Sequence, residues 1–142
     1  MPVQLTVEGA VAVVTLDRPE KKNALDVEMR EALITHFQRV RFDDDIRAMV
    51  LPGAGDGFCS GADVDRMPAS DIPASRKRMQ RLSHTYMRTL HAIEKPTIAA
   101  VRGHAVGIGW SLALGCDIVI ASDTAIFGQV FRRIGLAPDG GG

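Results

Sequence analysis

The chain has 142 residues, of which 46% are hydrophobic, and its 17 basic and 17 acidic side chains cancel. This length and composition allow one globular domain with a buried core, and the balanced charge gives no indication of a nucleic acid or membrane partner. Cys59 and Cys116 are too few for a disulfide framework or a structural zinc site, so we expect free thiols. The start of the chain lacks a signal peptide pattern, and no apolar run, 98–101 included, is long enough to span a bilayer. We therefore expect a cytoplasmic protein.

Hydrophobic patterns in the first third of the chain predict two strands followed by a helix and a third strand. The strands cover 4–7 and 10–16, with a turn between them. Asp26 is in position to cap a helix that ends at 43–45. The apolar stripe of this helix is Met29, Leu33, Phe37 and Val40. A short buried strand is expected over 48–51.

The rest of the chain continues the alternation. Two prolines in 68–75 predict a loop, and one helix follows it and ends before Pro96. The apolar stripe of that helix is Met79, Leu82, Tyr86, Leu90 and Ile93. Further elements are a strand at 97–101, a glycine-rich turn at 103–109, a short helix at 110–114, and strands at 117–121 and 125–128. The alternation of strands and helices predicts the α/β class.

Two glycine-rich turns stand out as candidate sites, Ser60–Asp63 and Gly107–Gly109. Glycine lets the backbone approach a ligand closely, and a turn that opens a helix leaves N–H groups without partners. Two such N–H groups aimed at one carbonyl oxygen would form an oxyanion hole. Plain structural turns are the more common explanation of this pattern, and the pattern alone favours them.

Five motifs carry a resemblance to a known family. They are the opening segment 16–25 (LDRPEKKNAL), the segment 58–64 (FCSGADV), the segment 95–109 (KPTIAAVRGHAVGIG), Cys116-Asp117-Ile118 and Phe127-Gly128. In this order and spacing they resemble the crotonase superfamily, the enoyl-CoA hydratase/isomerase family. The resemblance implies a crotonase (ClpP-like) spiral of ββα turns over residues 1–142. It also implies C-terminal helices that build trimers or dimers of trimers. The chain stops in a glycine run where another helix would open, so we expect that this C-terminal part is absent.

The resemblance also implies a site for an acyl-CoA thioester. The oxyanion donors would be the backbone N–H groups of Ala62 and Ile108. Residues expected to contact the substrate are Ala62, Asp63, Val64, Asp65, Ile108, Lys22, Ala24, Ser111 and Phe131. No separate cofactor and no metal are expected, because coenzyme A is part of the substrate. The positions of Arg18, Lys21 and Lys22 match those that meet the nucleotide end of coenzyme A in the family. A solvated loop is an equally good interpretation of these three charges.

Two departures from the family pattern bear on the reaction. Hydratases of the family carry two glutamates that activate water, and this chain has Ser111 and Phe131 in their places. Neither side chain can act as a general acid or base at neutral pH, so we expect hydration to be very weak. Asp139 stands where isomerase branches carry an acid. It would shuttle a proton in an enoyl-CoA isomerase, or it would only cap the helix opened by Pro138.

The sequence thus favours isomerisation of an enoyl-CoA double bond through an enolate held by the oxyanion hole. The alternatives are a hydratase with weak activity and a non-catalytic acyl-CoA-binding protein. We expect an apolar pocket lined by Phe131, Trp110, Leu136 and Ala137. Cys59 has no neighbouring cation in the sequence and is expected to be inert. The basic run 76–78 is interpreted as a solvated helix face.

Overall fold

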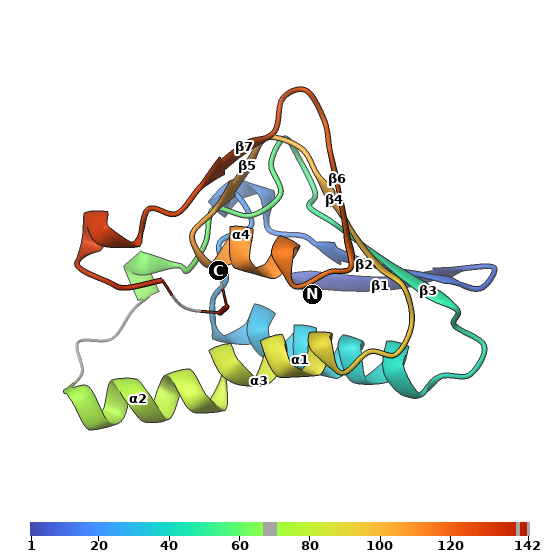
Figure 1. Ribbon diagram of the computed structural model, residues 1–142, viewed down its shortest axis with the longest axis horizontal. Helices are drawn as coiled ribbons and strands as arrows, with labels where there is room; N and C mark the ends of the chain where they lie inside the picture. The colour runs from blue at the N-terminus through green and yellow to red at the C-terminus, as the bar shows by residue number, and fades with distance from the viewer. Residues whose placement is uncertain (67–70, 139, 142) are drawn as a thin grey trace.

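The computed structural model describes residues 1–66, 71–138 and 140–141, and two sheets form its framework (Figure 1). The larger sheet has the strand order β1-β2-β3-β4-β6, in which only β1 and β2 are antiparallel. Its strands are β1 (Val3–Glu8), β2 (Val11–Leu16), β3 (Ala48–Pro52), β4 (Thr97–Val101) and β6 (Ile118–Ala121). The smaller sheet pairs β5 (His104–Val106) in parallel with β7 (Ile126–Gly128). The α/β class is confirmed.

Helices form the crossover connections that parallel strands require. They are α1 (Val27–Phe42), α2 (Ile72–Arg81), α3 (Ser83–His91) and α4 (Ile108–Leu114). Short 3₁₀ turns cover Pro19–Lys21, Val64–Arg66 and Phe131–Ile134. Helices α1 and α3 pack on each other, and α4 packs against β4, β5 and β6 (Figure 1). Within the described ranges, no helix has the length and apolar character needed to cross a membrane.

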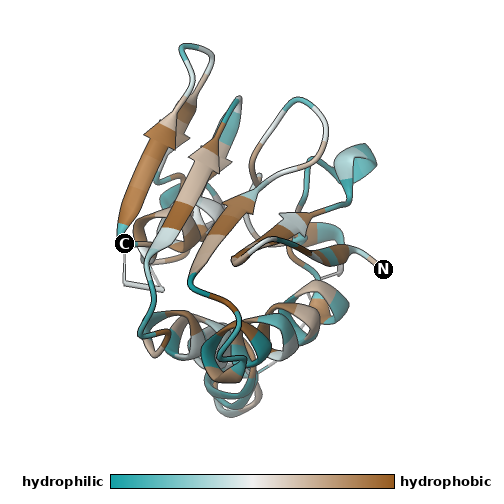
Figure 2. Cartoon of the chain, turned by 90° about the vertical axis from the view of Figure 1, so that its right-hand side faces the viewer, coloured by the Kyte–Doolittle hydropathy of each residue, from teal (hydrophilic) through white to brown (hydrophobic). Residues whose placement is uncertain are grey.

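The first helix forms where its cap and stripe predict it. The Asp26 carboxylate accepts a hydrogen bond from the N–H of Met29 at 2.9 Å, which satisfies one donor of the first turn. All four predicted stripe residues are fully buried in the hydrophobic core. Figure 2 shows the consequence: apolar strands face a layer of helices that carry more polar residues on their outer sides. Burial of this stripe fixes α1 against the sheet.

The region between β3 and β4 differs from the prediction in two ways. The single predicted helix is two helices, because the chain turns at Leu82 (φ −112°, ψ −71°) between α2 and α3. The predicted loop over 68–75 is wrong for 72–75, which belong to α2. The Asp71 carboxylate caps that helix by accepting from the N–H of Ala74 at 2.8 Å. Pro73 lies in the first turn, where its missing N–H costs no helical hydrogen bond.

The glycine-rich segment 103–109 contains a strand, β5, that the sequence prediction treated as a turn. Ala105 forms a parallel bridge with Cys59, and β5 also pairs with β7. Three residues are too few to show a period-two pattern, so only these partners from distant parts of the chain define the strand. The pairing places the start of α4 beside the segment that follows Cys59.

Candidate active site

A cavity of about 520 Å³ lies where the two glycine-rich turns meet. Its walls come from the first turn, from the start of α4, from α1, α2 and α3, and from the segment that follows β7. Ala62 and Ile108, the two expected oxyanion donors, both line it. The two turns therefore face one space rather than two.

Backbone hydrogen bonds hold the two turns together. The N–H groups of Phe58 and Cys59 both donate to the carbonyl of His104, at 3.1 and 2.9 Å, and the N–H of Val106 donates to the carbonyl of Cys59 at 2.9 Å. Gly61 then passes close to the second turn with φ +103°, a conformation that side chains disfavour. A Cβ atom on Gly61 would lie 2.9 Å from the oxygen of Val106 and 3.8 Å from the backbone nitrogen of Ile108.

Ala62 and Ile108 line the cavity, and the fold leaves the backbone N–H group of each unused. Ile108 is the first residue of α4, where an N–H group has no partner within the helix. The parallel bridge between Leu25 and Ala62 uses the N–H groups of Leu25 and Asp63 and leaves that of Ala62 unused. Among the hydrogen bonds between described residues, none involves the N–H of Ala62 or Ile108. Such a pair can hold a thioester oxygen and stabilise the negative charge that develops on it.

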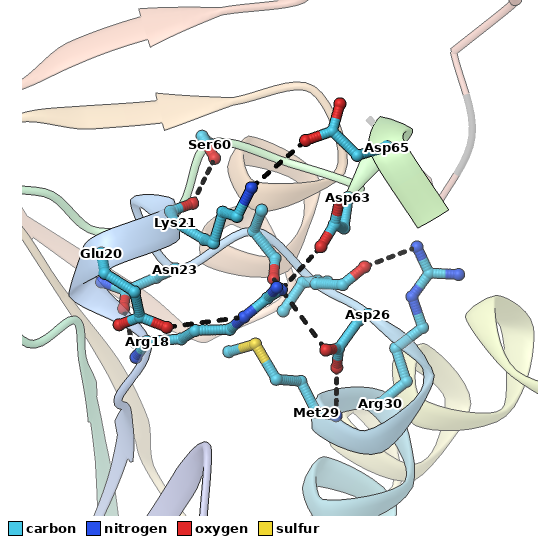
Figure 3. A network of polar contacts seen from close by, with 12 residues as sticks. Arg18, Glu20, Lys21, Asn23, Asp26, Met29, Arg30, Ser60, Asp63 and Asp65 are labelled. Atoms are coloured by element: carbon cyan, nitrogen blue, oxygen red, sulfur yellow. Dashed lines mark hydrogen bonds and ion pairs between the residues drawn. The ribbon is translucent and has the colours of Figure 1, made fainter. Parts of the chain in front are cut away.

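A buried ionic network fixes the first turn from the other side (Figure 3). Arg18 is 8% exposed, and its Nη1 atom lies 2.8 Å from the Asp63 carboxylate, 3.3 Å from the Asp26 carboxylate and 3.0 Å from the Ala24 carbonyl. Burial alone would lower the pKa of the Arg18 guanidinium, but Asp63, Asp26 and Glu20 outweigh it and raise that pKa. A solvated loop, one of the two equal interpretations, is therefore wrong for Arg18, which ties the start of α1 to the first turn.

The expected substrate contacts divide into two groups. Val64 and Phe131 line the cavity together with Ala62 and Ile108. The side chain of Asp63 is directed to Arg18, and Asp63 is not among the described residues that line the cavity. Asp65 is exposed and pairs with Lys21 at 3.3 Å.

The remaining expected contacts are not part of the described cavity lining. Lys22 is exposed, in the left-handed region at φ +51°. The backbone of Ala24 serves the Arg18 network, and Ser111 is buried within α4. None of the three is among the described residues that line the cavity. Asp139 lies outside the described residues.

The wall of the cavity is less apolar than expected. Leu136 and Ala137 line it as predicted, but Trp110 does not. Trp110 packs instead on Phe127, with ring centroids 4.2 Å apart. The wall also contains three arginines that the sequence prediction missed: Arg30, Arg78 and Arg133. Arg78 belongs to the basic run interpreted as solvated, and a helical pattern cannot show which flank of a helix borders a cavity.

Cys59 lies beside the first turn but is unsuited to act as a nucleophile. Its side chain is fully buried, and its Sγ atom lies 3.1 Å from the carbonyl of Asn23. Burial raises the pKa of this thiol to about 12. The reactive thiolate is therefore scarce at neutral pH, as expected for an inert cysteine. No group of three or more potential metal ligands gathers among the residues that the structure describes.

Known proteins share this sequence and arrangement. The model of the family described as "Enoyl-CoA hydratase/isomerase" matches residues 6–142. A probable enoyl-CoA hydratase of Mycobacterium tuberculosis, EchA14, is 41% identical over 140 residues, which are 99% of this chain and 54% of that protein. The 1,2-epoxyphenylacetyl-CoA isomerase of Escherichia coli is 43% identical over 139 residues, covering 96% of this chain and 53% of that protein.

A solved structure extends the likeness to the fold. The crystal structure of a putative enoyl-CoA hydratase from Thermobifida fusca, in complex with acetoacetyl-CoA, superposes with a TM-score of 0.83 at 33% identity. The match covers 98% of this chain and 58% of that one. The chain thus spans about half the length of the curated relatives it matches. The family model and the structural match agree with the crotonase fold expected from the motifs, and the chain belongs to the enoyl-CoA hydratase/isomerase family of the crotonase superfamily.

Proposed function

We propose that the protein is an enoyl-CoA isomerase that binds an acyl-CoA thioester in the 520 Å³ cavity. The observation that carries this proposal is that Ala62 and Ile108 line one cavity and that neither backbone N–H group has a hydrogen-bond partner among the described residues. These groups would hold the thioester oxygen and favour the enolate, which is the intermediate of double-bond migration. The acetoacetyl-CoA held by the Thermobifida fusca relative supports a thioester ligand for this chain.

The side chains at the cavity favour isomerisation over hydration. Phe131 lines the wall and stands where a hydratase of this family would have one glutamate; Ser111, which is not among the described lining residues, stands where it would have the other. The described residues that line the cavity include no aspartate or glutamate. A hydratase needs acid–base groups to position and activate water, whereas an isomerase needs one base that removes a proton and returns it elsewhere.

We propose Asp139 as that base. Its two neighbours in the chain support the assignment. Pro138 lines the cavity, and a Cβ atom on Gly140 would collide with Cδ1 of Ile108 and lie 3.2 Å from Cβ of Ser111. The backbone on both sides of Asp139 therefore lies at the wall that carries one oxyanion donor. Helix capping remains the competing role for this side chain.

The test compares two reactions of the full-length protein. We expect it to convert 3-hexenoyl-CoA to the conjugated 2-enoyl ester, followed by ultraviolet absorbance, and to hydrate crotonyl-CoA very slowly. Asp139→Asn keeps the size of the side chain and its capping ability but removes the exchangeable carboxylate proton. Isomerisation should fall by about two or more orders of magnitude, with little change in ligand affinity.

Three outcomes separate the alternatives. Isomerisation by Asp139→Asn at the wild-type rate would show that Asp139 does not transfer the proton and would leave helix capping as its role. Hydration of crotonyl-CoA by the wild-type protein at about ten per second would support a hydratase. Tight binding of acyl-CoA with no turnover of either ester would favour a binding protein.

A further inference from the structure

We propose that the acyl group of the substrate carries a carboxylate and that Arg30 binds it. This inference rests on the proposed binding of an acyl-CoA in the cavity and adds the class of acyl group. It starts from a charge that the proposed reaction does not use. Arg30, Arg78 and Arg133 all line the cavity, and no acidic residue accompanies them among its described lining.

Arg30 is held by neutral groups on both sides. Its Nη1 atom donates to the Ser83 hydroxyl at 3.3 Å, and its Nη2 atom donates to the Leu25 carbonyl at 3.2 Å. A guanidinium has five N–H donors, so these two bonds leave part of the fork unused. The Nε atom is buried and has no hydrogen-bond partner among the described residues. The side chain is thus held in place, and each Nη atom keeps a second N–H group that a ligand could use.

The charge of Arg30 also lacks a protein counter-ion in the described ranges. The ion pairs found there involve Arg18, Lys21 and Arg39, but not Arg30. Arg30 is half-buried, so water solvates its charge only in part, and a fixed guanidinium matches a carboxylate in a two-pronged geometry. Arg78 already has an interaction partner and Arg133 is exposed to solvent, so these two contribute positive potential around Arg30.

The position of Arg30 favours the acyl group over coenzyme A as the source of the anion. The cavity that Arg30 lines is also lined by Ala62 and Ile108, whose N–H groups are proposed to bind the thioester oxygen. The phosphates of coenzyme A are separated from the thioester by the whole pantetheine arm. The group that extends from the thioester into the same 520 Å³ space is the acyl chain, and Met79, Phe131 and Leu136 offer it apolar contacts.

Equilibrium binding tests the proposal independently of catalysis. Calorimetry on the full-length protein would compare adipoyl-CoA with hexanoyl-CoA, and suberoyl-CoA with octanoyl-CoA. Each pair has equal chain length and differs in the terminal carboxylate. We expect the wild-type protein to bind at least one dicarboxylic ester about ten- to a hundred-fold more tightly than its neutral counterpart, as for hydrogen bonds to a charged group.

Three variants define the role of Arg30. Arg30→Met should abolish the preference while leaving the affinity for the neutral esters nearly unchanged. Arg30→Lys keeps a positive charge without the fork and should retain part of the preference. The control is Arg41→Met, an exposed residue of the same helix that stacks on Phe42 and does not line the cavity. It should bind all four esters as the wild type does.

Several results would overturn the proposal. Equal binding of the neutral and dicarboxylic esters by the wild-type protein would reject the carboxylate site, even where Arg30→Met fails to fold. An equal loss for both kinds of ester in Arg30→Met would show that Arg30 serves the fold or a group of the protein itself. A preference for dicarboxylic esters without any isomerisation would support the carboxylate site and reject the proposed reaction.

Discussion

Replacing Arg18 with methionine should destabilise the protein strongly. The substitution keeps an unbranched side chain of similar length but removes the cation from between two carboxylates, Asp63 and Asp26, that are 7% and 8% exposed. Removing one partner of a buried pair costs about 3–5 kcal/mol, because the remaining charge stays buried without compensation. Asp26 keeps its hydrogen bond from Met29, so we expect a loss of about 3 kcal/mol in the free energy of unfolding.

Urea unfolding of the full-length protein, followed by circular dichroism, measures this loss. The double variant Arg18→Met/Asp63→Asn removes one of the two carboxylates that pair with Arg18 and should recover part of the stability. Arg41→Met is the matched control, because Arg41 is exposed on α1 and outside the network. A loss below about 1 kcal/mol for Arg18→Met, as for an exposed ion pair, would refute the argument that Arg18 fixes the first turn.

Further predictions concern the packing of Gly109 on Cys59 and the burial of the two thiols, Cys59 and Cys116. A Cβ atom on Gly109 would lie 2.5 Å from the oxygen and 2.8 Å from the Sγ atom of Cys59, so Gly109→Ala should lower stability by about 1–3 kcal/mol and reduce turnover. Gly128→Ala is its control, since that Cβ atom meets only one side-chain carbon at 3.5 Å; equal melting temperatures of the two variants would contradict the clash. Cys59 and Cys116 should resist iodoacetamide at pH 8 until urea is added, as measured by mass spectrometry, because burial raises both thiol pKa values to about 12. The unfolded thiols release their protons above an ordinary pKa of 9.0 and the folded thiols near 12, so the free energy of unfolding should fall as pH rises through that window. Rapid alkylation of the native protein would refute the burial of these thiols.

The elements that could be predicted from the sequence are those with local determinants. The α1 helix depends on the Asp26 cap and on a stripe of apolar residues, and both are visible in the order of residues. The strand β5 has three residues and owes its existence to Cys59 and β7, so no local pattern marks it. The break at Leu82 is likewise invisible, because the apolar stripe continues across both helices.

The same distinction applies to the candidate site. The motifs predicted that Ala62 and Ile108 act together, but their approach depends on hydrogen bonds between segments more than 40 residues apart, such as Cys59 to His104. Arg30 is a further case. Its position one residue after Met29 places it at the flank of the buried stripe, and only the packing of α1 on α3 shows that this flank borders the cavity.

The proposed oxyanion donors are backbone groups, so no side-chain substitution removes them directly. Their positions depend on two supports: the Arg18 network, which ties the first turn to α1, and the pairing of that turn with β5, which leads into α4. A catalytic geometry must be held to about half an ångström to work. Loss of either support should therefore reduce turnover under conditions in which the protein is still folded. Loss of the pairing with β5 would change the distance between the two N–H groups, and loss of the Arg18 network would release the first turn from α1. Asp139→Asn would leave both supports intact and affect only proton transfer.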